Sequence, residues 1–92
     1  MIARSLVIRG SVQGVGYRYA MVDAAESWGV AGWVRNRRDG TVEAFVQGEA
    51  AALETIIAWC RRGPPAARVT AVEAMPAPPD STLTDFTHRP TL

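Results

Sequence analysis

The sequence predicts an α+β fold in which a four-stranded sheet carries two helices on one face. Apolar and polar residues alternate along several short segments, which is typical of strands. Apolar residues recur at helical spacing in two other segments that lie between these strands. The 92 residues suit one two-layer core, and no repeat, linker or low-complexity segment divides them. We therefore expect a single domain over residues 1–92.

The first half of the chain reads as strand, helix, strand. Residues 3–12 form the first predicted strand, because their apolar side chains share one parity: Leu6, Ile8 and Val12. Residues 18–28 follow the i, i+3, i+4, i+7 spacing of a helix with one apolar face: Met21, Ala24, Ala25 and Trp28. Gly29 then ends the predicted helix, and residues 30–37 read as the second strand.

The second half begins with a hairpin, because the turn residues Arg38-Asp39-Gly40 separate two strand-like segments. Residues 41–47 alternate, and we expect Val42, Ala44 and Val46 to point inward and Glu43, Phe45 and Gln47 outward. Residues 49–62 read as a helix with an apolar stripe that includes Cys60, ended by Gly63-Pro64-Pro65.

Residues 67–75 read as the fourth strand. The prolines at 76, 78 and 79 forbid a continuing strand interior, and residues 83–89 suit a short edge strand.

These elements follow the order βαββαβ. Two β-α-β units joined by a tight hairpin predict a ferredoxin-like sandwich with a mostly antiparallel sheet and strand order 4-1-3-2. The strands at 3–12 and 30–37 are then parallel, with 41–47 between them. Their carboxyl ends lie at the same edge, so the loop after the first strand should face Asn36 at the end of the second.

Composition narrows the possible functions. The net charge of +1 is too small to indicate nucleic-acid binding. A single cysteine excludes an internal disulfide, and no Cys/His cluster has metal-ligand spacing. The N-terminus has no apolar leader and no stretch reaches membrane-spanning length. We expect a cytoplasmic protein that does not bind a membrane, and a monomer is the simplest oligomeric state.

The loop Gln13–Arg18 is the most informative segment. It joins a strand directly to a helix start, so its backbone N–H groups lack helical partners, and no Ser, Thr, Asp or Asn is placed to cap them. Gly14 and Gly16 allow these groups to converge into an anion-binding nest. Arg18 adds a permanent charge that suits phosphate. On the glycines alone, however, an ordinary turn is the better interpretation, and neither a dinucleotide nor a Walker motif is present.

The whole string GSVQGVGYR at residues 10–18 is more specific, because it resembles the acylphosphatase signature G-x-V-Q-G-V-x-[FY]-R. A second block at 32–36, Gly-Trp-Val-Arg-Asn, is similar to that family's G-W-V-x-N, at a matching separation. The family has the same βαββαβ fold, hydrolyses acyl phosphates to carboxylate and inorganic phosphate, and needs no cofactor.

The resemblance implies a role for each matching residue. Arg18 would bind the phosphate and Asn36 would orient the attacking water, which makes both catalytic. The phosphate would also contact the loop residues Gly14, Val15, Gly16 and Tyr17 together with Arg18. No residue is implied as a metal ligand. The substrate would be a small acyl phosphate, which the sequence does not specify further.

Two other functions stay open. A phosphate-sensing or carbamoyl-phosphate-handling module could keep the fold without turnover. A ferredoxin-like RNA-binding domain would need aromatic residues on its central strands, and only Phe45 is available there. Each catalytic residue also has an alternative without a function: Arg18 could be a solvated arginine, and Asn36 an ordinary turn residue. We expect no catalytic role for His88 or Cys60.

Overall fold

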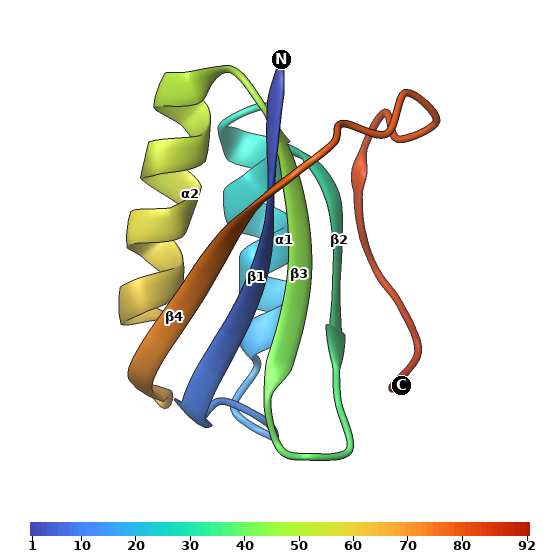
Figure 1. Cartoon of the computed structure of the whole chain (residues 1–92). Coiled ribbons are helices and arrows are strands. Elements are labelled where there is room, and N and C mark those ends of the chain that lie inside the picture. The colour runs from blue at the N-terminus through green and yellow to red at the C-terminus, as the bar shows by residue number, and fades with distance from the viewer.

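The computed structural model describes all residues, 1–92. Seven elements follow one another along the chain: β1 (Ile2–Ser11), α1 (Tyr17–Ser27), β2 (Ala31–Asn36), β3 (Val42–Gly48), α2 (Ala50–Arg62), β4 (Arg68–Ala77) and β5 (Phe86–His88). Figure 1 shows both helices behind one face of the sheet, while the other face is uncovered. The predicted elements are therefore confirmed, with ends that differ by at most three residues.

The sheet has the order β4-β1-β3-β2-β5. The first four strands reproduce the predicted order 4-1-3-2, with antiparallel pairing between all neighbours. The short edge strand β5 pairs in parallel with β2. Because β1 and β2 both pair antiparallel with β3, they run in the same direction and end at the same edge of the sheet.

The core lies between the helices and the sheet. Alternation along each strand sends one set of apolar side chains toward the helices. The largest members of this buried set are Leu6, Ile8, Tyr17, Met21, Leu53, Ile56 and Phe86. Cys60 is fully buried among them, as expected of a small core residue. No helix is both long and apolar enough to cross a membrane.

Gln47 and β4 differ from the predictions. Gln47 was expected to point outward, yet it is only 1% exposed. The loop after β4 covers it, and its side chain bonds both the N–H and the carbonyl of Asp80. β4 also continues through Pro76 to Ala77, because it lies at the edge of the sheet, where proline is tolerated.

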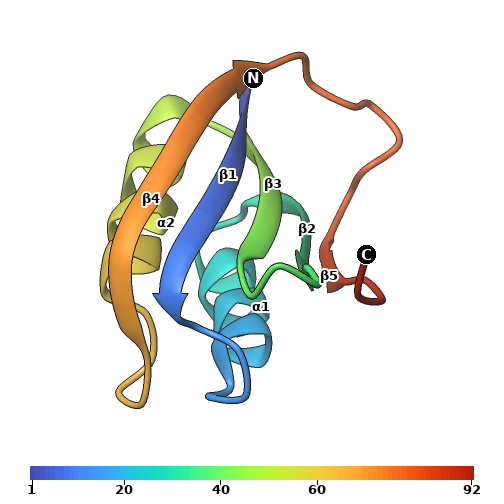
Figure 2. The ribbon, with the colours of Figure 1, turned by 60° about the horizontal axis from the view of Figure 1, so that its bottom comes forward.

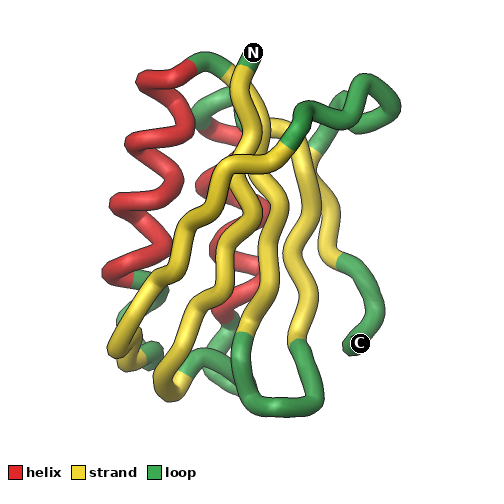
Figure 3. Tube along the Cα trace, in the orientation of Figure 1, coloured by secondary structure: helices red, strands yellow, loops and turns green.

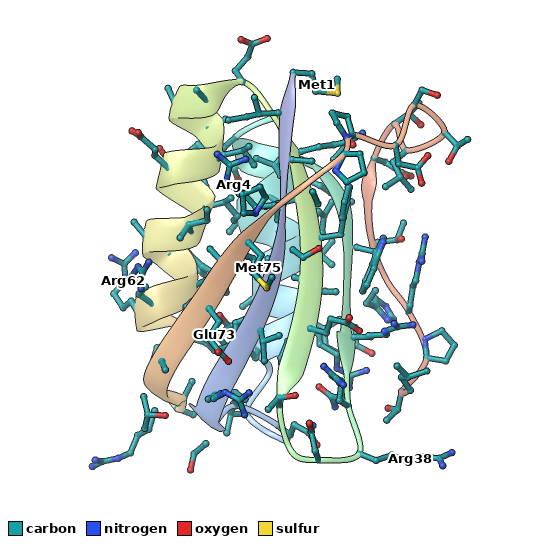
Figure 4. All side chains as sticks on the ribbon, in the orientation of Figure 1. Met1, Arg4, Arg38, Arg62, Glu73 and Met75 are labelled. Carbon is teal, nitrogen blue, oxygen red and sulfur yellow. The ribbon has the colours of Figure 1, made fainter.

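The uncovered face carries polar and aromatic side chains. Figure 4 shows Glu73 and Met75 on this face. Trp33 stacks on Phe45 there, with ring centroids 6.4 Å apart. Trp28 was expected on the apolar face of the first helix, but it is 40% exposed because it caps the helix C-terminus. The expectation of a packed Trp28 is therefore wrong.

Candidate active site

The loop after β1 and the hairpin after β2 meet at one end of the molecule. Figure 2 turns this end forward, and Figure 3 shows the loop segments gathered there. A side chain joins them directly, because Gln13 Nε2 donates to the carbonyls of Arg37 and Thr41 at 2.7 and 2.8 Å. The loop and the hairpin therefore lie together at one edge of the sheet, as the topology predicted.

The loop has the backbone of an anion-binding nest. Gly14 and Gly16 have φ angles of 72° and 80°, whereas no other type of residue in the chain has a positive φ. The sign of φ therefore alternates from Gln13 to Tyr17. Such alternation turns successive N–H groups toward one concave side. A Cβ at either glycine would meet nothing within 4 Å, so the backbone conformation alone, not crowding, favours glycine there.

The N–H groups of this loop are free within the chain. None of those from residues 15–19 donates to another group, and the first helical bond runs from Ala20 N to Gly16 O at 3.1 Å. Gly16 occupies the N-cap position and offers no side chain to cap the helix. The positive end of the α1 dipole and its unbonded donors therefore point at the same place, which favours an anion.

The side chain of Tyr17 fixes the loop to the core. Its ring is buried, and its hydroxyl donates to the Cys60 carbonyl at the end of α2 at 2.8 Å. Burial, and then the neighbouring Cys60, raise the pKa of this phenol far above its usual range. The side chain of Tyr17 thus belongs to the core, and only its backbone N–H is available to the loop.

Arg18 follows in the first turn of α1 and is half-buried. Its guanidinium carbon lies 6.0 Å from the centre of the Tyr19 ring. The chain's two ion pairs are Arg9–Glu73 and Arg35–Glu43, so no carboxylate neutralises Arg18. A positive charge without a counter-ion in the first turn of α1 adds to the attraction for an anion.

Asn36 ends β2 at the same edge. It has the parity of the buried Val34, so both side chains point to the helix-covered face. Its Oδ1 is the one buried side-chain oxygen or nitrogen without a hydrogen-bond partner. A buried polar atom of this kind calls for a partner such as a water or ligand. Its backbone carbonyl accepts from the Leu92 N–H at 3.1 Å, which fixes the end of the strand.

The hairpin after Asn36 is closed by Asp39. Asp39 Oδ1 accepts from Thr41 Oγ1 and Thr41 N at 2.6 and 3.0 Å. These hydrogen bonds lower the pKa of Asp39. Arg38, at the tip of the turn, points away from the molecule in Figure 4.

The sequence assigns Gln13 to the phosphate-binding loop, but it does not show that Gln13 joins this loop to the hairpin after β2. Its contacts join segments 24 and 28 residues away, and no local pattern could have revealed them.

The site is an open nest at the edge of the sheet. A hollow on the uncovered face is lined by Trp33, Phe45 and Pro79. A phosphate-sized anion does not need such a hollow, because backbone donors and one arginine can hold it. No group of three or more His, Cys, Asp or Glu residues is arranged to hold a metal ion.

Comparison with known proteins identifies the family. A family model described as acylphosphatase matches residues 4–88. An acylphosphatase of Acidovorax sp. (strain JS42) is 57% identical over 77 residues, covering 84% of this chain and 79% of the relative. The crystal structure of acylphosphatase from Bacillus subtilis matches with a TM-score of 0.92 at 31% identity, over 97% of this chain and 99% of that one. Full-length HypF in its phosphate- and nucleotide-bound form matches with a TM-score of 0.87 at 26% identity, over 98% of this chain but 12% of that one. The chain belongs to the acylphosphatase family.

Proposed function

We propose that this chain hydrolyses small acyl phosphates to a carboxylate and inorganic phosphate, with the phosphoryl group held at the loop Gln13–Arg18. Family membership supports the reaction. One structural observation supports the placement: the unpartnered Oδ1 of Asn36 and the unbonded N–H groups of residues 15–19 lie at the same edge of the sheet. An acceptor for water and a set of donors for phosphate are the two parts that the reaction needs.

The phosphoryl group binds in the nest formed by the loop Gln13–Arg18. Backbone N–H groups of Val15, Gly16, Tyr17 and Arg18 donate to its oxygens, and Gly14 gives the loop the required turn. The Arg18 guanidinium offers forked donors that match two phosphate oxygens. These donors are in place before the substrate arrives, so little reorganisation is needed as charge develops.

Asn36 positions the attacking water. Its buried Oδ1 accepts a hydrogen bond from that water, while its amide nitrogen can donate to a phosphoryl oxygen. The bond from the water oxygen to phosphorus forms as the bond from phosphorus to the acyl oxygen breaks. The leaving carboxylate is a weak base and needs little protonation, so positioning and charge stabilisation account for catalysis.

A phosphoryl oxygen of the substrate accepts the proton of the water. The thiol of Cys60 offers no base for this proton, because it is buried and burial raises its pKa. A pH–rate profile that requires an enzyme group titrating near neutrality would contradict it.

We further propose that the protein works as a monomer in the cytoplasm, on a small-molecule substrate and without nucleic acid or membrane. The buried, unpaired thiol of Cys60 suits a reducing compartment. A sedimentation measurement that finds a stable dimer at assay concentration would contradict the monomer.

Acetyl phosphate turnover tests the function. We expect the wild-type chain to release phosphate, Arg18→Ala to lose both activity and inhibition by phosphate, and Asn36→Ala to lose activity while retaining inhibition. Arg62→Ala is the matched control, because this exposed arginine lies at the end of α2. A folded wild-type chain that binds phosphate without turnover would instead favour a phosphate-sensing module, the second candidate.

A further inference from the structure

We propose that Tyr19 and His88 form a platform that receives the acyl group of the substrate and favours flat, aromatic acyl groups. The inference rests on the proposed position of the phosphoryl group at the loop and Arg18. The proposed function places the phosphoryl group in the nest but gives no position for the acyl group, and the platform supplies that position.

The two rings already contact each other. Their centroids are 5.0 Å apart, in an edge-on arrangement with an interplanar angle of 63°. Tyr19 is 63% exposed, and no hydrogen bond of its hydroxyl to the chain is present. An exposed aromatic pair offers apolar surface that another ring can cover.

The platform lies next to the phosphate-binding arginine. The Arg18 guanidinium carbon is 6.0 Å from the Tyr19 ring centre. An acyl group bonded to a phosphate on Arg18 extends only a few bonds from it. Tyr19 is therefore a large, exposed side chain close enough to the arginine for such a group to reach.

His88 reaches the platform because of the pairing of β5. His88 lies beside Val34 in the parallel ladder with β2, and so shares the helix-covered face with Val34 and Asn36. The chain then stays with β2, since Arg89 N donates to the Val34 carbonyl at 2.8 Å and Leu92 N to that of Asn36 at 3.1 Å. The segment 88–92 thus forms one wall of the site.

The chemistry of this wall favours an aromatic acyl group over a small aliphatic one. Two rings present faces and edges on which a third ring can stack. A methyl group, as in acetyl phosphate, is too small to cover either ring.

The test compares kcat/KM for benzoyl phosphate with that for acetyl phosphate. Because the result for each variant is the ratio of these two values, a change that affects both substrates equally cancels. We expect Tyr19→Ala to lower the ratio about two- to tenfold, the usual contribution of an aromatic pair. His88→Ala should lower it less, and Tyr19→Phe should keep it. Trp28→Ala is the matched control, an exposed ring at the opposite end of α1.

Inhibition constants separate an acyl-binding role from simple support of Arg18. Tyr19→Ala should weaken inhibition by phenylphosphonate more than inhibition by inorganic phosphate, which has no group for the platform. Equal weakening of both inhibitors, or an unchanged benzoyl-to-acetyl ratio in Tyr19→Ala, would overturn the platform while leaving the proposed function intact. A wild-type chain that turns over neither substrate would overturn the proposed function itself, and the platform with it.

Discussion

Replacing Gln13 by alanine tests how the two halves of the site are held together. The substitution removes the hydrogen bonds from Gln13 Nε2 to the carbonyls of Arg37 and Thr41. Neither carbonyl is left without a partner, because Arg37 O still accepts from Gly40 N and Thr41 O from Arg37 N. The substitution therefore leaves no carbonyl without a hydrogen bond. Each lost hydrogen bond should lower the free energy of unfolding by only about 0.5–1 kcal/mol, the lower end of the usual range.

The loss in the free energy of unfolding should therefore be about 1–2 kcal/mol. The same bonds hold the phosphate loop against the hairpin that follows Asn36. Small displacements between reacting groups are costly, so we expect kcat to fall about tenfold under conditions where the variant is fully folded. Urea unfolding gives the first quantity and acetyl phosphate turnover the second.

Gln47→Ala is the matched control for Gln13→Ala. Gln47 Nε2 also donates to two carbonyls, those of Asp80 and Leu83, at the opposite end of β3. We expect Gln47→Ala to lose stability but to change kcat less than twofold. If Gln13→Ala loses stability but keeps the wild-type kcat, Gln13 only stabilises the fold, and its proposed role in aligning the two halves of the site is refuted.

Three further predictions concern the surroundings of the site. Burial raises the pKa of the Cys60 thiol to about 12, so iodoacetamide at about pH 8 should label the chain only after unfolding, and rapid labelling of folded protein would contradict this. Tyr17→Phe leaves the Cys60 carbonyl without its donor, and Pro64 has no N–H to replace it, so thermal unfolding should show a loss of about 1–2 kcal/mol. Hydrogen bonds from Thr41 lower the pKa of Asp39, so its contribution to stability is present above the unfolded pKa of about 4 and is lost as pH falls through the lower folded value. Urea unfolding should therefore show wild type more stable than Asp39→Ala at neutral pH, with a difference that shrinks on acidification, and a constant difference would argue against the Asp39 carboxylate.

The sequence predicted the fold well because periodicity and topology rules act on every element. Alternation and helical spacing located the strands and helices, and right-handed crossovers then limited the strand order. Gln47 was misplaced because alternation gives the face of a side chain but not whether a distant loop covers that face. Trp28 was misplaced because it falls where the helix ends and the apolar stripe no longer meets the sheet.

The site was predictable only in part. Gly14, Gly16 and the missing cap are visible in the sequence, and both glycines have the expected positive φ. The unpartnered Oδ1 of Asn36 and the bridge from Gln13 depend on segments that meet only in the folded chain. The wall formed by residues 88–92 also depends on pairing with β2, which weak strand signals near a chain end do not specify.

The proposed function requires phosphate to bind at the unbonded N–H groups of residues 15–19, together with Arg18. A titration of the folded chain with inorganic phosphate, followed by the chemical shifts of individual amide N–H groups, tests it most directly. We expect the amide signals of Val15, Gly16, Tyr17 and Arg18 to move together and to saturate with one dissociation constant, equal to the inhibition constant for phosphate. Saturable shifts centred on another part of the chain, with these four amides unmoved, would contradict it.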